Sequence, residues 1–184
     1  HEHPRTYSLR SFLRISEKMN LSVISYSFPK RYGGNIRVLI GKTKNKKIKI
    51  KNESSFFFRF KTLGASIQKW KKRKKKELII LSKKYGPLSA KAFPGRASIL
   101  IKLLNINNKI LSEVYEKPKS KKIGHYVPGT SIPIRSDYLF LKNMGKIKVL
   151  INLAWHIKKE VKIYLRKMGY KGKIIDILQT KDFV

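Results

Sequence analysis

The part of the sequence after Gly86 and Pro87 alternates short apolar runs with amphipathic segments, and this alternation restricts the chain to one class of fold. Strands are expected at 88–93, 109–115, 147–153 and 173–177, with helices at 98–104, 136–141 and 157–168. Such alternation predicts an α/β unit with a Rossmann-like parallel sheet and flanking helices. Ligands of such sheets bind beyond the carboxyl ends of the strands.

The turn after the first of these strands is a candidate anion site. Pro94 and Gly95 reverse the chain before the helix at 98–104, and Arg96 carries a guanidinium group suited to phosphate. A helix start in this position directs unpaired N–H groups toward an anion. An ordinary strand-to-helix loop explains the same residues, so both interpretations stay open.

Two other segments are expected at the same edge of the sheet. The loop from 116 to 130 contains Pro128, Gly129 and Thr130, which form either a tight connection or a ligand wall. Trp155 and His156 follow the strand near 149–153, where the tryptophan could stack on a ligand or pack in the core.

The residues before Pro87 predict a different organisation. Ser8 can cap a helix from Leu9 to about Met19, and two strands at 21–28 and 36–40 are joined by a glycine turn. Apolar residues between 54 and 85 recur at spacings of three, four and eight, which predicts one long helix. The chain therefore divides into a helix and β-hairpin segment (1–52), a connecting helix (53–86) and the Rossmann-like domain (87–184).

The net charge of +34, from 44 basic and 10 acidic residues, suggests a polyanionic partner. Lysines are spread along every segment, however, and the seven residues of the run from Trp70 to Lys76 cover about two helical turns, so their charges point in many directions. This run is either a solvated helix or a nucleic-acid site. We expect only non-specific electrostatic binding of nucleic acid.

Cysteine is absent, which excludes disulfides and a cysteine zinc site within this chain. No apolar run is long enough to span a bilayer and no signal peptide opens the sequence, so we expect no membrane partner and a cytoplasmic location. In an extended segment His1 and His3 lie on one face and Glu2 on the other. Two histidines make an incomplete metal site, and no metal is expected.

Several blocks, in order along the chain, resemble the C-terminal half of the S-adenosylmethionine-dependent C-methyltransferases that act on nucleotide-linked keto-sugars. The blocks are HEH at 1–3, YSLRSFLRI at 7–15, YGGNIRV at 32–38, GRASILIKLL at 95–104, YVPGTSIPI at 126–134 and VLINLAWHIKKEV at 149–161. The sequence departs from the family pattern at Tyr32, where histidine is usual, at Arg96, where lysine is usual, and at His156, where asparagine follows the tryptophan.

The resemblance implies roles for individual residues. His3 matches the general base that removes a proton beside the ketone, and Glu2 matches the carboxylate next to it. Substrate contacts are implied for the following residues: Tyr32, Gly34, Asn35, Arg37, Gly95, Arg96, Pro128, Gly129, Thr130, Trp155 and His156.

The resemblance also implies S-adenosylmethionine as cofactor, bound by a domain that is not in this chain, and a nucleotide-linked sugar as substrate. The chain starts at a histidine inside a family motif, so we expect a fragment that is inactive alone. The alternative is a basic nucleic-acid-binding protein of the ribosome-associated type.

Overall fold

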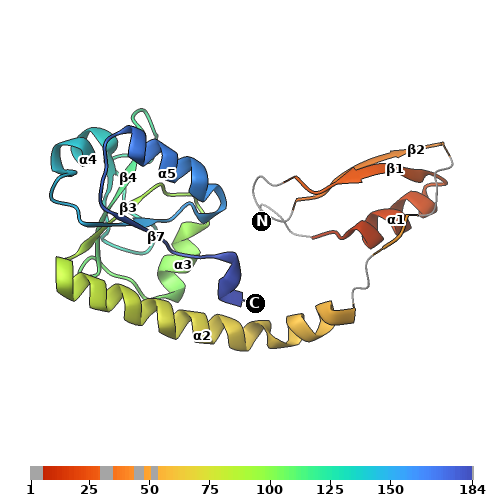
Figure 1. The fold of residues 1–184 in the computed structure, drawn as a ribbon, viewed down its shortest axis with the longest axis horizontal. Helices are drawn as coiled ribbons and strands as arrows, with labels where there is room; N and C mark the ends of the chain where they lie inside the picture. The colour runs from red at the N-terminus through yellow and green to blue at the C-terminus, as the bar shows by residue number, and fades with distance from the viewer. Residues whose placement is uncertain (1–5, 30–34, 44–47, 51–53, 184) are drawn as a thin grey trace. The chain divides into compact units, whose positions relative to one another are not determined.

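The computed structural model of the protein describes residues 6–29, 35–43, 48–50 and 54–183 (Figure 1). Its contacts divide the chain into two compact units, which comprise residues 1–58 and 59–184. None of the helices within these described ranges is long and apolar enough to cross a membrane.

The first unit contains the predicted helix and strand pair. Helix α1 (Leu9–Lys18) begins at Ser8, whose Oγ accepts a hydrogen bond from the N–H of Ser11, while the Ser11 Oγ accepts one from the N–H of Ser8. Strands β1 (Ser22–Ser27) and β2 (Arg37–Gly41) pair antiparallel. The predicted helix and neighbouring strands are therefore confirmed.

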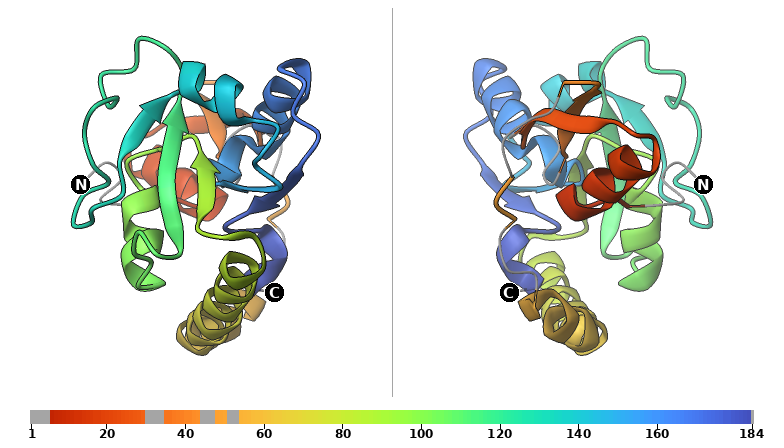
Figure 2. Two further views of the ribbon diagram at one scale, coloured as in Figure 1. Left: turned by 90° about the vertical axis from the view of Figure 1, so that its left-hand side faces the viewer. Right: turned by 90° about the vertical axis from the view of Figure 1, so that its right-hand side faces the viewer.

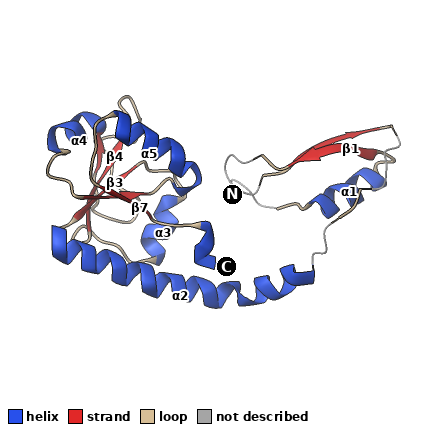
Figure 3. Cartoon of the chain, in the orientation of Figure 1, coloured by secondary structure: helices blue, strands red, loops and turns tan. Residues whose placement is uncertain are grey.

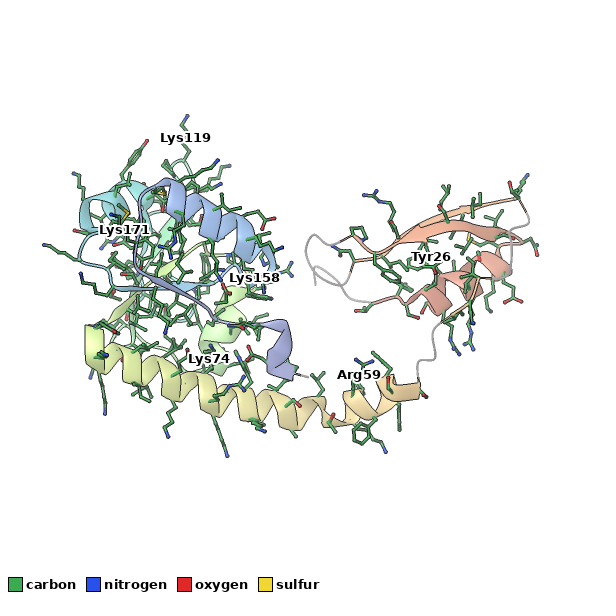
Figure 4. All side chains as sticks on the ribbon, in the orientation of Figure 1. Tyr26, Arg59, Lys74, Lys119, Lys158 and Lys171 are labelled. Atoms are coloured by element: carbon green, nitrogen blue, oxygen red, sulfur yellow. The ribbon has the colours of Figure 1, made fainter. Side chains whose placement is uncertain are left out.

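Helix α2 (Ser54–Tyr85) has the predicted bounds and ends before the Gly86–Pro87 pair. Its buried residues are Trp70, Lys74 and Leu78, which recur every fourth position and so share one helix face. Lys74, labelled in Figure 4, donates from Nζ to Glu77 at 2.7 Å. The run from Trp70 to Lys76 is thus not wholly solvated, because it supplies part of the packing face.

The second unit is built on a five-stranded sheet in which every pair is parallel. The strands are β3 (Leu88–Lys91), β4 (Leu111–Glu116), β5 (Ile134–Ser136), β6 (Val149–Asn152) and β7 (Lys173–Asp176). They lie in the order β5-β4-β3-β6-β7, and Figure 2 gives two further views of the ribbon. The predicted parallel sheet is confirmed, and β5 is an additional strand that the sequence pattern does not predict.

Helices cover both faces of this sheet (Figure 3). Alternate strand residues point to opposite faces, so Ala90 and Ile151 join a core cluster with α2 and α3 (Ala97–Leu103). Tyr115 and Leu150 join a second cluster with α4 (Asp137–Asn143) and α5 (Lys158–Lys167). Short 3₁₀ helices η1 (Trp155–Ile157) and η2 (Thr180–Phe183) precede α5 and follow β7.

The strand order reverses direction next to the central strand. From β3 the chain moves outward through β4 to β5, and it then crosses to β6 on the other side of β3. The carboxyl ends of β3 and β6 therefore flank a topological switch point, which is where open α/β sheets bind ligands.

Candidate functional site

A cavity of about 310 Å³ lies at this switch point. Its walls come from the segments that follow β3, β4 and β6 and from the first turns of α5. The residues that line it are Lys91, Ala92, Phe93, Pro94, Glu116, Lys117, Lys122, Ala154, His156, Ile157, Glu160, Val161 and Tyr164. We call this cavity the carboxyl-edge pocket.

A buried ion pair lies at one side of the carboxyl-edge pocket, and its lysine lines the pocket. Lys91 Nζ lies 2.7 Å from both carboxylate oxygens of Asp137, and the Tyr164 hydroxyl donates to Asp137 Oδ2 at 2.7 Å. Burial lowers the pKa of Lys91, opposed by the hydrogen bond to Asp137. Burial, with the bond to Asp137, raises the pKa of Tyr164. The network ties β3, α4 and α5 together.

The backbone of Phe93 is held from two directions at the rim of the pocket. Its N–H donates to Glu116 Oε1 at 2.6 Å, and its carbonyl oxygen accepts from Lys122 Nζ at 2.6 Å. These bonds join the segment after β4 to the turn after β3. Lys117, exposed beside them, places Nζ 4.9 Å from the centre of the Tyr164 ring.

Asn152 shapes the wall on the β6 side. Its Oδ1 accepts from the Ala154 N–H at 3.0 Å, and its Nδ2 donates to Asp176 Oδ1 at 2.8 Å. Asn152 is 0% exposed, so both bonds lie in the interior. The bond to Ala154 fixes the turn that leads to His156.

His156 is half-buried and lines the pocket together with the buried Ala154. Burial lowers the pKa of the imidazole, and the positive charge of Arg96 lowers it further, while Glu160 opposes the change. The ring is therefore neutral near pH 7. A neutral imidazole offers one donor and one acceptor, which suits a sugar hydroxyl or carbonyl.

The structure brings together some of the residues predicted to contact substrate. Gly95 and Arg96 directly follow Pro94, which lines the pocket, and the charge of Arg96 reaches His156. Trp155 is partly buried and packs against the core cluster on the α2 and α3 face. Of its two predicted arrangements, packing in the core is the one observed.

Pro128, Gly129 and Thr130 do not line the pocket. They form a turn that closes on itself, since the Thr130 N–H donates to the Val127 carbonyl at 3.0 Å and Thr130 Oγ1 accepts from the Ile132 N–H at 3.1 Å. Val127 and Ile132 are each 0% exposed and anchor this turn in the core. Substrate contact by the three residues stays a prediction.

The remaining predicted residues belong to the first unit. Arg37 opens β2 opposite Ser27, and Asn35 precedes it; both are exposed. The other four, for which the family resemblance implies base and substrate roles, lie outside the described residues: Glu2, His3, Tyr32 and Gly34. All of these assignments stay predictions.

Glu116, Lys117 and Lys122 were not predicted individually. A signal was available for Glu116, because an acidic residue about 20 positions after the first turn of such a sheet is typical of nucleotide-binding folds. For the lysines no signal distinguishes the pocket residues from the many solvated ones.

Trp70 bears on the nucleic-acid interpretation. Its side chain is 1% exposed and its ring packs against Phe183, with centroids 5.8 Å apart. The ring therefore offers no open face on which a base could stack.

A parallel sheet with a pocket at its switch point places the second unit among the doubly wound α/β domains, whose ligands bind beyond the carboxyl ends of the strands. Comparison with family models identifies the particular family: residues 30–175 match the C-methyltransferase C-terminal domain, and the chain belongs to this family. A methyltransferase-related role follows. The comparison with curated proteins found no match.

Proposed function

We propose that this chain is the substrate-binding portion of an S-adenosylmethionine-dependent C-methyltransferase, and that the carboxyl-edge pocket holds a nucleotide-linked keto-sugar. One observation carries the proposal: a pocket at the switch point combines cationic side chains with groups that hydrogen-bond to hydroxyls. The family assignment supports the class of reaction.

Within the proposal, the cations and the imidazole serve different parts of the substrate. Lys117 and Lys122 line the β4 side, where they attract the diphosphate. His156, on the β6 side, hydrogen-bonds to the sugar. Lys91 has a structural role instead, because Asp137 holds its ammonium group in a fully buried pair.

The pocket does not suit S-adenosylmethionine. The donor carries a sulfonium cation, which Lys117 and Lys122 would repel, and the turn after β3 contains a single glycine, Gly95, in place of a glycine-rich loop. We therefore assign no donor contact to this pocket. His3, beside Glu2, remains the proposed base that takes the proton next to the ketone, and we expect the chain alone to bind substrate without methylating it.

The test is an isothermal titration of the chain with dTDP-glucose, UDP-glucose and GDP-mannose at about 150 mM salt. Lys117→Gln should weaken binding of the preferred nucleotide-sugar about tenfold, because a charge-assisted contact is lost. Lys121→Gln is the matched control: it removes the same charge from an exposed lysine outside the pocket. Equal effects of the two substitutions, or no binding of any nucleotide-sugar, would contradict the proposal.

His156→Ala tests the β6 side of the pocket separately. The substitution should weaken binding of the nucleotide-sugar more than binding of the corresponding nucleoside diphosphate, because the imidazole is assigned to the sugar. If both affinities stayed unchanged, His156 would have no place in the site.

A further inference from the structure

Helix α2 begins with large aromatic side chains that are exposed to solvent. Phe56, Phe57, Phe58 and Phe60 are between 64% and 69% exposed. At about 100° per residue, the three consecutive phenylalanines point in three directions about the helix axis. Single apolar residues are common on protein surfaces, but a contiguous group of large ones marks an interaction site.

Lysines follow these aromatic residues on the side of α2 that faces away from the sheet. The exposed residues that share this helix face, at spacings of three, four and eight, are Phe58, Lys61, Lys69, Lys72 and Lys76. We call this set the outer face of α2. The buried Trp70 and Lys74 each lie two positions from Lys72, which is about 200° around the axis. Figure 4 shows side chains with nitrogen ends projecting from this side of the helix.

The charge of this region selects an anionic partner. The stretch from Ser54 to Lys76 contains nine lysines and arginines and no acidic residue. A second copy of the chain carries the same charge and would be repelled. A cluster of lysines on one face of a helix is typical of binding to anionic lipid headgroups. Such headgroups present negative charge over a continuous surface, so the cations need no fixed spacing.

The directions of the aromatic side chains distinguish a lipid surface from an acidic groove in a protein. A groove covers one apolar stripe of a helix, and Phe56, Phe57 and Phe58 do not share a stripe. Lipids rearrange around side chains that point in several directions. Arg59 and Lys61, next to the phenylalanines, have long alkyl stems that reach through the acyl region while their charged ends stay at the headgroups.

We propose that the start and the outer face of α2 bind the surface of a membrane that contains anionic lipids. Phe57 and Phe58 enter the boundary between headgroups and acyl chains, while the lysines of the outer face lie along the headgroups. The expectation of no membrane partner rested on the lack of a spanning segment, which such surface binding does not require. The inference is independent of the carboxyl-edge pocket, because none of these residues lines it.

The experiment is sedimentation of the chain with large unilamellar vesicles, made of phosphatidylcholine alone or with phosphatidylserine as about a third of the lipid. At about 150 mM salt the chain should bind the mixed vesicles at least 25-fold more tightly. Lys72→Gln/Lys76→Gln should weaken binding to the mixed vesicles about 25-fold, since each cation near an anionic surface contributes about fivefold. Phe57→Ser/Phe58→Ser should weaken it more than tenfold, because both side chains then lose their apolar burial in the lipid.

Each double variant has a matched control elsewhere in the second unit. Lys102→Gln/Lys142→Gln removes two exposed lysines from α3 and α4, and Ile99→Ser/Ile163→Ser removes apolar side chains that are 60% and 57% exposed. Both controls should keep the vesicle affinity within about threefold of the unmodified chain, because their residues lie off the outer face.

Three results would overturn the inference. The first is equal affinity for the two kinds of vesicle, and the second is a control variant that weakens binding as much as its partner variant. The third is vesicle affinity that Phe57→Ser/Phe58→Ser leaves unchanged, which would reduce the binding to attraction by net charge. A loss of oligouridine binding in this variant that matches its loss of vesicle binding would assign the surface to single-stranded nucleic acid and also overturn the inference.

Discussion

The buried pair of Lys91 and Asp137 should dominate the stability of the second unit. The substitution Lys91→Met keeps most of the side-chain volume but removes the cation, and it leaves Asp137 with a side chain 2% exposed. Of the side-chain bonds to its carboxylate described above, only the one from the Tyr164 hydroxyl then remains. Removing one partner of such a pair costs about 3–5 kcal/mol.

That cost is large compared with the total stability of a domain, which is about 5–15 kcal/mol. With a urea dependence of about 2 kcal/mol per molar, Lys91→Met should lower the unfolding midpoint by about 2 M. Both tryptophans of the chain, Trp70 and Trp155, lie in the second unit, so their fluorescence reports its unfolding.

The double variant Lys91→Met/Asp137→Leu provides the control, because it removes both charges together. Replacing both partners of a buried pair with apolar residues is often close to neutral, so this variant should recover most of the stability lost by Lys91→Met. A loss below about 1 kcal/mol for the single variant, or a double variant that loses the sum of the two single effects, would refute the reasoning. If the single variants do not fold, the stability of the double variant alone tests the reasoning, since removing both charges should be close to neutral.

Three further predictions concern particular side chains. Gly129→Ala should cost about 1 kcal/mol in unfolding free energy, because Gly129 has φ +75°, although an added Cβ would meet open space. Gly95→Ala, without a positive φ, should change the unfolding free energy by no more than about 0.5 kcal/mol, and equal losses for the two substitutions would contradict the argument. Trp70→Ala should cost about 3–5 kcal/mol in unfolding free energy because its side chain is buried, whereas Ile80→Ala, at 54% exposure on the same helix, should be nearly neutral. Urea unfolding followed by circular dichroism measures both, and a small loss of unfolding free energy for Trp70→Ala would refute its place in the core. An NMR titration of the imidazole should place the pKa of His156 below its ordinary 6.5, and a pKa above 6.5 would contradict this. Because the folded state then binds protons less readily than the unfolded state, His156 should reduce the stability of the protein as the pH falls from 6.5 through the lowered pKa.

The sequence was sufficient to predict the elements whose pattern is local. The strands from 88 and from 149 are buried on both faces, so they appear as short apolar runs. The Gly86–Pro87 pair ends the long helix at its observed residue. Strand β5 was not predicted, because a strand of three residues is too short to show a periodic pattern.

The contacts of the site depend on tertiary closure, so the sequence predicted them only in part. A tryptophan directly after a strand can face either side of the sheet, and the observed packing of Trp155 follows from the turn that Asn152 fixes. The hydrogen bonds of the Phe93 backbone with Glu116 and Lys122 join residues more than 20 positions apart. The hydrophobic periodicity of a sequence carries no information about contacts between such distant residues.

The central claim is that the carboxyl-edge pocket, and not the dispersed lysine surface, binds a nucleotide-linked sugar. The most direct measurement is an NMR titration of the isotope-labelled chain with its preferred nucleotide-sugar, with backbone amide shifts assigned along the second unit. We predict that the largest shifts occur at Phe93, Lys117 and His156 and that they persist at about 150 mM salt. Shifts spread along the lysines of α2, or shifts that disappear at that salt concentration, would contradict the account.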